Sequence, residues 1–207
     1  MVISNFKAIF TASEMRAMDK AVIESGELTG LLLMKRAARA SFKFLSTTWP
    51  SNNNIQILCG SGNNAGDGYL LAALALSHGW KVAVWQVGDT SKITGDAALA
   101  RDYALDHGVA EKIYFSGALG QSGVIVDAML GIGFKGKMRS LFKEAATEAN
   151  KSGLPILALD LPSGLEADTG AAAPDAITAD HTITFVGKKR GSLTASGPDF
   201  TGHLTLD

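Results

Sequence analysis

The chain is poor in the features that mark several classes of protein. Its single cysteine, Cys59, cannot form an intramolecular disulfide. No apolar run approaches the ~20 residues that a membrane-spanning helix requires, and residues 1–10 lack the charged start and long apolar stretch of a signal peptide. Neither sign of charge dominates, since 19 basic and 20 acidic residues give a net charge of -1, so nothing favours binding to nucleic acid or to a membrane. We therefore expect a soluble cytoplasmic protein.

What the chain does contain is the alternation of an α/β fold. Its 207 residues suit one domain, residues 1–207, without repeats or a linker. Helical spacing of apolar side chains predicts two helices at the start, over residues 12–25 and 31–46. Apolar runs then predict strands over residues 54–60, 81–87, 112–115, 123–130, 155–161, 181–186 and 202–206, and helical patterns fall at 66–78, 95–106 and 139–151. This alternation predicts a mostly parallel sheet that helices cover on both faces.

The loops that follow three of these strands are the expected place for the chemistry. In parallel sheets, ligands bind beyond the carboxyl ends of strands, where the strand order reverses. We therefore expect the loops after Gly60, Asp127 and Asp160 to meet in one cleft. The two N-terminal helices must pack on the sheet or on another subunit.

A glycine-rich loop, residues 60–68 (GSGNNAGDG), joins the first strand of the alternating region to a helix. Its G-x-G-x-x-x-G spacing is one residue longer than the usual dinucleotide fingerprint, and it lacks the Lys-Ser/Thr ending of a P-loop. Such a pattern alone is more often a plain strand–helix turn, but Asn63, Asn64 and Asp67 add oxygen atoms that a turn does not require. The start of the helix offers a phosphate site. The only candidate for the ribose-binding acid of a usual NAD site is Asp89, which we interpret as a turn residue.

Two acids and one basic cluster are the other candidates. Asp127 lies within an apolar strand, where a carboxylate is costly unless it is paired, bound to a cation or used to cap nearby backbone. Asp160 ends a predicted strand ahead of Pro162, so it is either a catalytic acid or the cap of an Asx-type turn. The basic run at residues 187–191 (GKKRG) could hold phosphates, although a solvated turn is the commoner structure.

Other kinds of catalytic site fail on inspection. The four histidines lie far apart, with no carboxylate or cysteine at metal-ligand spacing. No G-x-S-x-G motif is present, and Ser163 stands in Pro-Ser-Gly instead. Cys59 ends an apolar strand, so we expect it in the core rather than as a nucleophile.

Taken together, these segments resemble the YjeF N-terminal family, the NAD(P)HX epimerases. Several independent motifs match in order and spacing, almost from end to end of the chain. They are residues 12–19 with Leu33 and Met34, the N-N-x-G-D-G loop at 63–68, the V-D-A segment at 126–136, D-x-P-S-G at 160–164 with D-T-G at 168–170, and residues 179–191. The resemblance implies a Rossmann-like three-layer αβα sandwich with a mostly parallel sheet and two N-terminal helices.

The resemblance also implies an activity and its residues. Members convert the R epimer of NADHX or NADPHX, which are hydrated at C6 of the nicotinamide ring, to the S epimer. The implied substrate-binding residues are Asn63, Asn64, Ala65, Gly66, Asp67, Gly131, Ile132, Gly133, Phe134, Lys135, Gly136, Lys137 and Asp160. The implied ligands of a structural potassium ion are Asn64, Asp127 and Ser163, whose oxygen atoms suit a hard cation. No other cofactor is implied, because the dinucleotide is the substrate.

Inversion at C6 requires a bond to be broken and remade there. Either water leaves and returns on the other face, or the ring opens and recloses, and both routes need a proton donor and a proton acceptor. We expect Asp160 to be the general acid/base and Lys189 to be its electrostatic partner or proton relay. The potassium ion is expected to fix the loops rather than to polarise the substrate.

Partners and alternatives follow from the same resemblance. The family is commonly dimeric, and the two N-terminal helices carry more apolar residues than an exposed pair needs, so we expect a homodimer built in part by them. An ATP- or ADP-dependent dehydratase is the expected functional partner, and the sequence leaves open whether it follows as a fused C-terminal domain. The alternatives are a non-catalytic dimerising scaffold or nucleotide-binding domain of the same fold, and an ordinary NAD-dependent dehydrogenase. The intact Asn64, Asp127 and Asp160 argue against the scaffold, and the longer glycine loop argues against the dehydrogenase.

Overall fold

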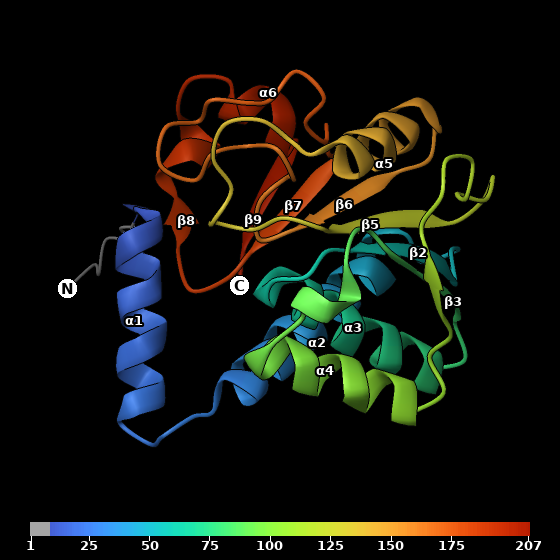
Figure 1. Cartoon of the computed structure of the whole chain (residues 1–207), viewed down its shortest axis with the longest axis horizontal. Coiled ribbons are helices and arrows are strands. Elements are labelled where there is room, and N and C mark those ends of the chain that lie inside the picture. Colours follow the sequence, from blue (N-terminus) through green and yellow to red (C-terminus); the bar gives the residue numbers. More distant parts are fainter. Residues whose placement is uncertain (1–8) are drawn as a thin grey trace.

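The computed structural model describes residues 9–207, whose arrangement is shown in Figure 1. Seven strands form one sheet, and two short strands form another. The strands are β1 (Ile9–Phe10), β2 (Asn54–Cys59), β3 (Lys81–Gln86), β4 (Glu111–Ile113), β5 (Val124–Ala128), β6 (Ile156–Leu159), β7 (His181–Thr184), β8 (Lys188–Lys189) and β9 (His203–Leu206). The helices are α1 (Ala12–Glu24), α2 (Gly30–Thr48), α3 (Asn63–Ser77), α4 (Gly95–Asp106), α5 (Ser140–Lys151) and α6 (Gly197–Thr201), with 3-10 turns at Thr90–Lys92 and Arg190–Leu193.

The large sheet is parallel throughout, in the order β4-β3-β2-β5-β6-β7-β9. From β2 the chain moves outward through β3 to β4, and it then crosses back to enter β5 on the other side of β2. The strand order therefore reverses between β2 and β5, and the loops that leave their carboxyl ends diverge there. The predicted parallel sheet is confirmed, and its topology fixes where a ligand site is expected.

Helices cover both faces of the sheet, which confirms the predicted three-layer fold. α2, α3 and α4 lie on one face, and α5 and α6 lie on the other (Figure 1). Side chains of the central strands alternate between two apolar clusters: Ile55 and Ile57 pack with the α3 side, whereas Leu58 packs with the α5 side. Burial on both faces holds the carboxyl ends of β2, β5 and β6 in fixed positions.

Helix α3 begins at Asn63, whereas the sequence predicted its start at residue 66. The extended residue Gly62 is the N-cap, so the Asn-Asn-Ala-Gly segment forms the first helical turn. Asparagine and glycine are poor helix formers, which is why the pattern resembled a loop. No side chain among the described residues caps this end of the helix, so free N–H groups of its first turn are left available to a ligand.

The two N-terminal helices have different surroundings. α2 packs along α3 and α4, whereas α1 stands apart from the helical layer and buries only Ala12 and Met15 (Figure 1). β1, just ahead of α1, pairs in parallel with β8, so that Phe10 lies beside Lys189. Neither this small sheet nor α6 was predicted, because elements this short carry no periodicity. Within residues 9–207, no helix combines the length and the apolar character needed to cross a membrane.

Candidate functional site

A cavity of about 930 Å³ lies at the carboxyl edge of the sheet. Its wall is built by the loops after β2 and β5, by Asp160 after β6, by Lys189 of β8, and by α1 and α2. The expected substrate-binding residues that reach this wall are Asn63, Asn64, Asp67, Gly131, Ile132, Gly133, Phe134, Lys135, Lys137 and Asp160. The three motifs therefore meet in one place, as their positions after strand ends predicted.

The remaining three residues of that set lie behind or beside the wall. Ala65 and Gly66 are buried in α3, and a Cβ atom on Gly66 would lie 2.7 Å from the Sδ atom of Met34. Gly66 thus allows α2 to pack closely on α3. Gly136 has a φ of +76° and donates its N–H to Glu166 Oε1 at 2.9 Å, which ties the β5–α5 loop to the segment after β6.

The loops that follow the neighbouring strands β2 and β5 approach each other very closely. A Cβ atom on Gly60 would lie 1.9 Å from the carbonyl oxygen of Met129, so only glycine fits there. A Cβ atom on Gly131 would lie 3.3 Å from the Cβ of Asn64. These glycines bring the first turn of α3 against the loop after β5, so the two loops form one continuous wall.

Asp127 sits behind this wall and has no exposed surface. Its Oδ1 accepts the hydroxyl of Ser163 at 2.6 Å and the N–H of Met129 at 3.1 Å, and its Oδ2 accepts the N–H of Ser163 at 2.7 Å. Burial raises the pKa of Asp127 to about 6, although these hydrogen bonds act in the opposite direction. The carboxylate thus caps nearby backbone, one of the roles that the sequence left open, and it joins the loops after β5 and β6.

Asn64 adds a further oxygen to the same place. Its Nδ2 donates to the carbonyl of Leu130 at 3.0 Å, and the N–H of Leu130 donates to Ser163 Oγ at 2.8 Å. The Oδ1 atom of Asn64 is buried and has no hydrogen-bond partner among the residues that the structure describes. A buried oxygen without a donor is costly, so this atom fits a cation or a water molecule. The oxygen atoms around it belong to neutral groups and to one carboxylate, and such ligands suit a hard cation.

Asp160 follows β6 in a conformation that is rare for a residue with a side chain. Its φ is +66°, and its N–H donates to the carbonyl of Ile183 at 2.7 Å, which holds this backbone in place. Its Oδ1 accepts the hydroxyl of Thr184 at 3.2 Å and the ammonium of Lys189. The side chain is 17% exposed and reaches the cavity, so it can contact a bound ligand.

Lys189 is the charge partner of Asp160 and is almost fully buried. Its three N–H groups are all used, by Asp160 Oδ1, by Thr184 Oγ1 at 2.9 Å and by the carbonyl of Phe185 at 3.1 Å. The solvated turn that the basic run alone favoured is therefore wrong for Lys189, although Arg190 is exposed. The cause is tertiary: β8 pairs with β1, and a Cβ on Gly191 would lie 2.0 Å from the carbonyl of Glu166.

Two more acids reach the cavity beside this pair. Burial raises the pKa of Asp67, in the second turn of α3, well above its ordinary value, and the charge of Asp160 raises it further. The same two causes raise the pKa of Asp19 on α1. Asp19 was not among the residues predicted for the site. The available signal was its position on the helical stripe that carries Met15 and Val22, where an acid is out of place.

Two residues that the sequence excluded from the site do lie away from it. Asp89 is exposed and caps its own turn, accepting the N–H of Ser91 at 3.0 Å and lying 3.7 Å from the ammonium of Lys92. It is a turn residue, as interpreted, and it leaves the dehydrogenase alternative without its ribose-binding acid. Cys59 is buried in the core, and burial raises the pKa of its thiol.

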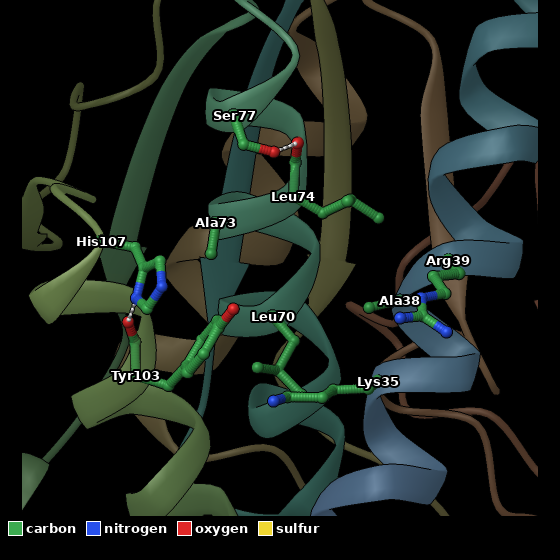
Figure 2. Close-up of a pocket in the computed structure, with 9 residues that line it drawn as sticks. All are labelled: Lys35, Ala38, Arg39, Leu70, Ala73, Leu74, Ser77, Tyr103 and His107. Carbon is green, nitrogen blue, oxygen red and sulfur yellow. Dashed lines mark hydrogen bonds between the residues drawn. The ribbon is translucent and has the colours of Figure 1, made fainter.

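A second hollow of about 130 Å³ lies between α2, α3 and α4 (Figure 2). The ammonium of Lys35 lies 4.3 Å from the centre of the Tyr103 ring, and Tyr103 stacks on His107 at 3.9 Å. Ser77 donates its hydroxyl to the carbonyl of Leu74 at 2.7 Å. The hollow runs towards the carboxyl end of α3, away from the helix start that faces the large cavity, and its ring, ammonium and hydroxyl groups already have partners.

Comparison with known proteins identifies relatives of this chain. A family model described as "YjeF-related protein N-terminus" matches residues 30–191. The bifunctional NAD(P)H-hydrate repair enzyme Nnr of Coxiella burnetii is 35% identical over 96% of this chain and 41% of its own length. The NAD(P)H-hydrate epimerase of Rhodopirellula baltica is 32% identical over 94% of this chain and 81% of its own length.

The chain covers different shares of the lengths of these relatives. It spans about two fifths of the length of the bifunctional relatives, including the Escherichia coli protein that is 37% identical. A crystal structure of a yeast protein, 21% identical, superposes with a TM-score of 0.80 and covers 96% of this chain and 87% of that one. That likeness establishes the shared fold.

Proposed function

This chain belongs to the family of YjeF-related N-terminal domains, and from that premise we propose that it epimerises hydrated nicotinamide dinucleotides. It would convert R-NADHX or R-NADPHX to the S epimer at C6 of the hydrated ring. One observation carries the proposal: the pair of Asp160 and Lys189 lies at the wall of a large cavity, on backbone held at a positive φ. The names of the relatives from Rhodopirellula baltica and Legionella pneumophila, both NAD(P)H-hydrate epimerases, support the substrate class.

The cavity suits a dinucleotide in size and in charge. Pockets for small ligands usually measure about 300–1,000 Å³, and this one is near the upper end. The uncapped start of α3 offers N–H groups and the positive end of a helix dipole to a pyrophosphate. Lys135 and Lys137 line the cavity from the β5–α5 loop and are exposed, so they can meet the remaining negative charge.

In the proposed reaction Asp160 moves the proton. Lys189 donates to its Oδ1 and so stabilises the ionised carboxylate, which can then accept a proton from the substrate. Loss and return of water, or opening and reclosing of the ring, would invert C6 in either case. Because Lys189 is buried and fully hydrogen-bonded, its main role is electrostatic.

We also propose a potassium ion held by Asn64, Asp127 and Ser163. The buried Oδ1 of Asn64, which lacks a hydrogen-bond partner among residues 9–207, and the buried carboxylate of Asp127 support this proposal. When bound, the ion would supply positive charge that offsets the burial of Asp127. The three side chains would thereby fix the loops around the cavity.

A homodimer is the remaining structural prediction. α1 buries only two of its residues within one chain, and the exposed apolar side chains of Ile23 and Leu32 lie on either side of the α1–α2 turn. A second copy packed on these helices would cover them. Light scattering at micromolar concentration should give twice the mass of the chain, and a monomeric mass would count against this arrangement.

The product points to a partner enzyme. An ATP- or ADP-dependent dehydratase that consumes the S epimer is the proposed next enzyme, and the bifunctional names of several relatives support a link between the two activities. The cytoplasm stays the predicted location.

The deciding experiment is an epimerisation assay. R-NADHX is prepared by hydration of NADH, and formation of the S epimer is followed by chromatography or through an added dehydratase. Acceleration over the uncatalysed interconversion is expected. No acceleration, with dinucleotide binding retained, would instead favour the non-catalytic scaffold of the same fold.

A further inference from the structure

Three of the five aspartates that line the large cavity come from separate elements and share it with one buried ammonium. Asp19 comes from α1, Asp67 from α3 and Asp160 from the end of β6, and Lys189 comes from β8. The ammonium of Lys189 has three N–H groups, and Asp160, Thr184 and the carbonyl of Phe185 take all of them. It therefore has no donor left for either of the other two acids.

Asp67 is only partly exposed, at the wall of the cavity. None of the ion pairs and hydrogen bonds found among residues 9–207 reaches its carboxyl group. It leaves α3 one turn after Asn63 and lines the same wall as Asp160. A partly buried carboxyl that is near another carboxylate and has no cation of its own keeps its proton more readily than a free aspartate does.

The other charges that face the cavity do not replace this missing partner. They are Arg16 and Asp19 of α1, Arg36 of α2, Asp96 of α4, Lys135, Lys137 and Arg139 of the β5–α5 loop, and Asp207 after β9. The basic members are exposed side chains, whose interactions water weakens. Burial and Asp160 both raise the pKa of Asp67, and Lys189 lowers it by less.

We infer that Asp67 is a second catalytic residue of the proposed epimerase, the proton-carrying partner of the ionised Asp160 in the same cavity. The inference rests on the proposed function and deepens it. The buried ammonium of Lys189 bonds to Asp160 and not to Asp67, so the surroundings favour the ionised form of Asp160 and the protonated form of Asp67. Such a division gives one site an acid and a base at the same pH.

Each route of inversion uses both groups. If the ring opens, the Asp160 carboxylate takes the proton of the C6 hydroxyl, C6 becomes a carbonyl, and the electrons of the broken C6–N1 bond go to N1, which takes the proton of Asp67. Rotation and the reverse steps close the ring on the other face and return both protons. If water leaves instead, Asp67 protonates the departing hydroxyl while the N1 lone pair forms the C6–N1 double bond. Water then adds to the opposite face and gives its extra proton to Asp160, from which cavity water returns it to Asp67.

The test is the pH dependence of kcat/KM in three variants. Wild-type activity should fall at high pH as Asp67 loses its proton, because the pKa of Asp67 lies well above the ordinary value of an aspartate. Asp67→Asn should lower kcat by ~10²–10⁴-fold, change KM far less, and abolish the alkaline fall. Asp160→Asn should also lower kcat, and it should move the alkaline fall to lower pH, because the charge that raises the pKa of Asp67 is gone.

Asp19→Asn is the matched comparison, because it removes the same charge from the same cavity. It should keep the alkaline fall and lose less than tenfold in kcat. An Asp67→Asn protein that folds, stays active and keeps the alkaline fall would overturn the inference while leaving the proposed function intact. An inactive wild-type protein would overturn the proposed function first.

A second measurement does not depend on the Asp67 variant folding. Carboxyl carbons of the wild-type protein, labelled on aspartate, can be titrated by ¹³C NMR. The carboxyl of Asp67 should titrate well above the ordinary pKa of an aspartate, and its pKa should fall in Asp160→Asn, because the charge that raises it is gone. Ionisation of every aspartate other than Asp127 well below neutral pH would overturn the inference.

Discussion

Asp127 and Asp160 belong to neighbouring parallel strands, β5 and β6, and yet they have opposite surroundings. Asp127 is wholly buried, and its two oxygens accept donors from Ser163 and Met129. Asp160 lies one residue beyond its strand, faces the cavity and pairs with Lys189. The residue type and the position near a strand end are the same, so neither decides the role. The partners that the fold supplies decide it: backbone and hydroxyl donors for one, a buried ammonium for the other.

The two regions are nevertheless connected by one short loop. Asp160 and Ser163 are three residues apart, and they point to different sides, Asp160 to the cavity and Ser163 to Asp127. Leu161 between them is fully buried and anchors the loop in an apolar cluster. A disturbance at Asp127 therefore acts on the loop that carries Asp160, but by position and not through proton transfer. Separate effects on stability and on rate would confirm this division.

The largest effect is expected for Asp160→Asn. Asparagine tolerates the positive φ at this position and keeps the size of the side chain, so the protein should fold. It cannot exchange the proton, so kcat should fall by ~10²–10⁴-fold while dinucleotide binding weakens far less. Steady-state kinetics and a binding titration measure the two separately. A folded variant with near-full activity would remove Asp160 from the mechanism and leave Lys189 as the residue to test.

A smaller effect, on stability, is expected for Asp127→Ala. The N–H groups of Ser163 and Met129 and the Ser163 hydroxyl would lose their acceptor inside the protein. Each buried donor left unpaired costs about 1–3 kcal/mol, so the free energy of unfolding should fall by several kcal/mol in denaturant titrations. Asp127→Asn keeps the volume and one acceptor oxygen, so it should lose less.

The change of Tm with potassium is a second test of the difference between Asp127 and Asp160. Replacing choline chloride by potassium chloride should raise the Tm of the wild-type protein and of Asp160→Asn, but not that of Asp127→Asn. Ion binding to the folded state stabilises it by mass action, and this variant lacks the charge that attracts the ion. If Asp127→Ala kept wild-type stability and lost activity instead, the two aspartates would not have distinct roles.

The elements that the sequence predicted well are those with long apolar runs. β2 and β5 are buried on both faces, and their composition alone identifies them. The strands of the small sheet have two residues each and exist only because β1 and β8 meet across the chain. Local sequence carries no trace of such a pairing.

The residues of the candidate site also fall into two groups, those that the local sequence predicted and those whose place depends on distant contacts. Asp127 and Asp160 were predicted because an acid at the end of an apolar strand is conspicuous, and the glycine loop because of its spacing. The burial of Lys189 could not be deduced from its basic neighbours, because it depends on β1 and on the close approach of Gly191 to Glu166. Its place in the site came from family resemblance alone.

The smallest effect is expected from a third aspartate, Asp168, which acts on α1. Its Oδ1 accepts the N–H of Ala12 at 2.6 Å, at the first residue of the helix that carries Asp19 to the cavity. A negative charge at a helix start contributes about 0.3–1 kcal/mol, and α1 has few other contacts with the body of the protein. Asp168→Ala should therefore loosen α1 and leave the core intact.

Three measurements distinguish this local effect from a general one. The free energy of unfolding should change by less than ~1 kcal/mol, amide exchange in α1 should quicken, and KM should rise a few-fold with kcat nearly unchanged. Asp168→Asn keeps an oxygen acceptor for Ala12 and should restore KM. If kcat instead fell as far as in Asp160→Asn, Asp168 would act through its neighbour Ala167, whose carbonyl accepts the N–H of Gly191 at 2.6 Å, and thus on Lys189. In that case the segment that anchors α1 would also position the ammonium of Lys189, which pairs with Asp160. The anchoring of α1 and the catalytic pair would then depend on the same contacts.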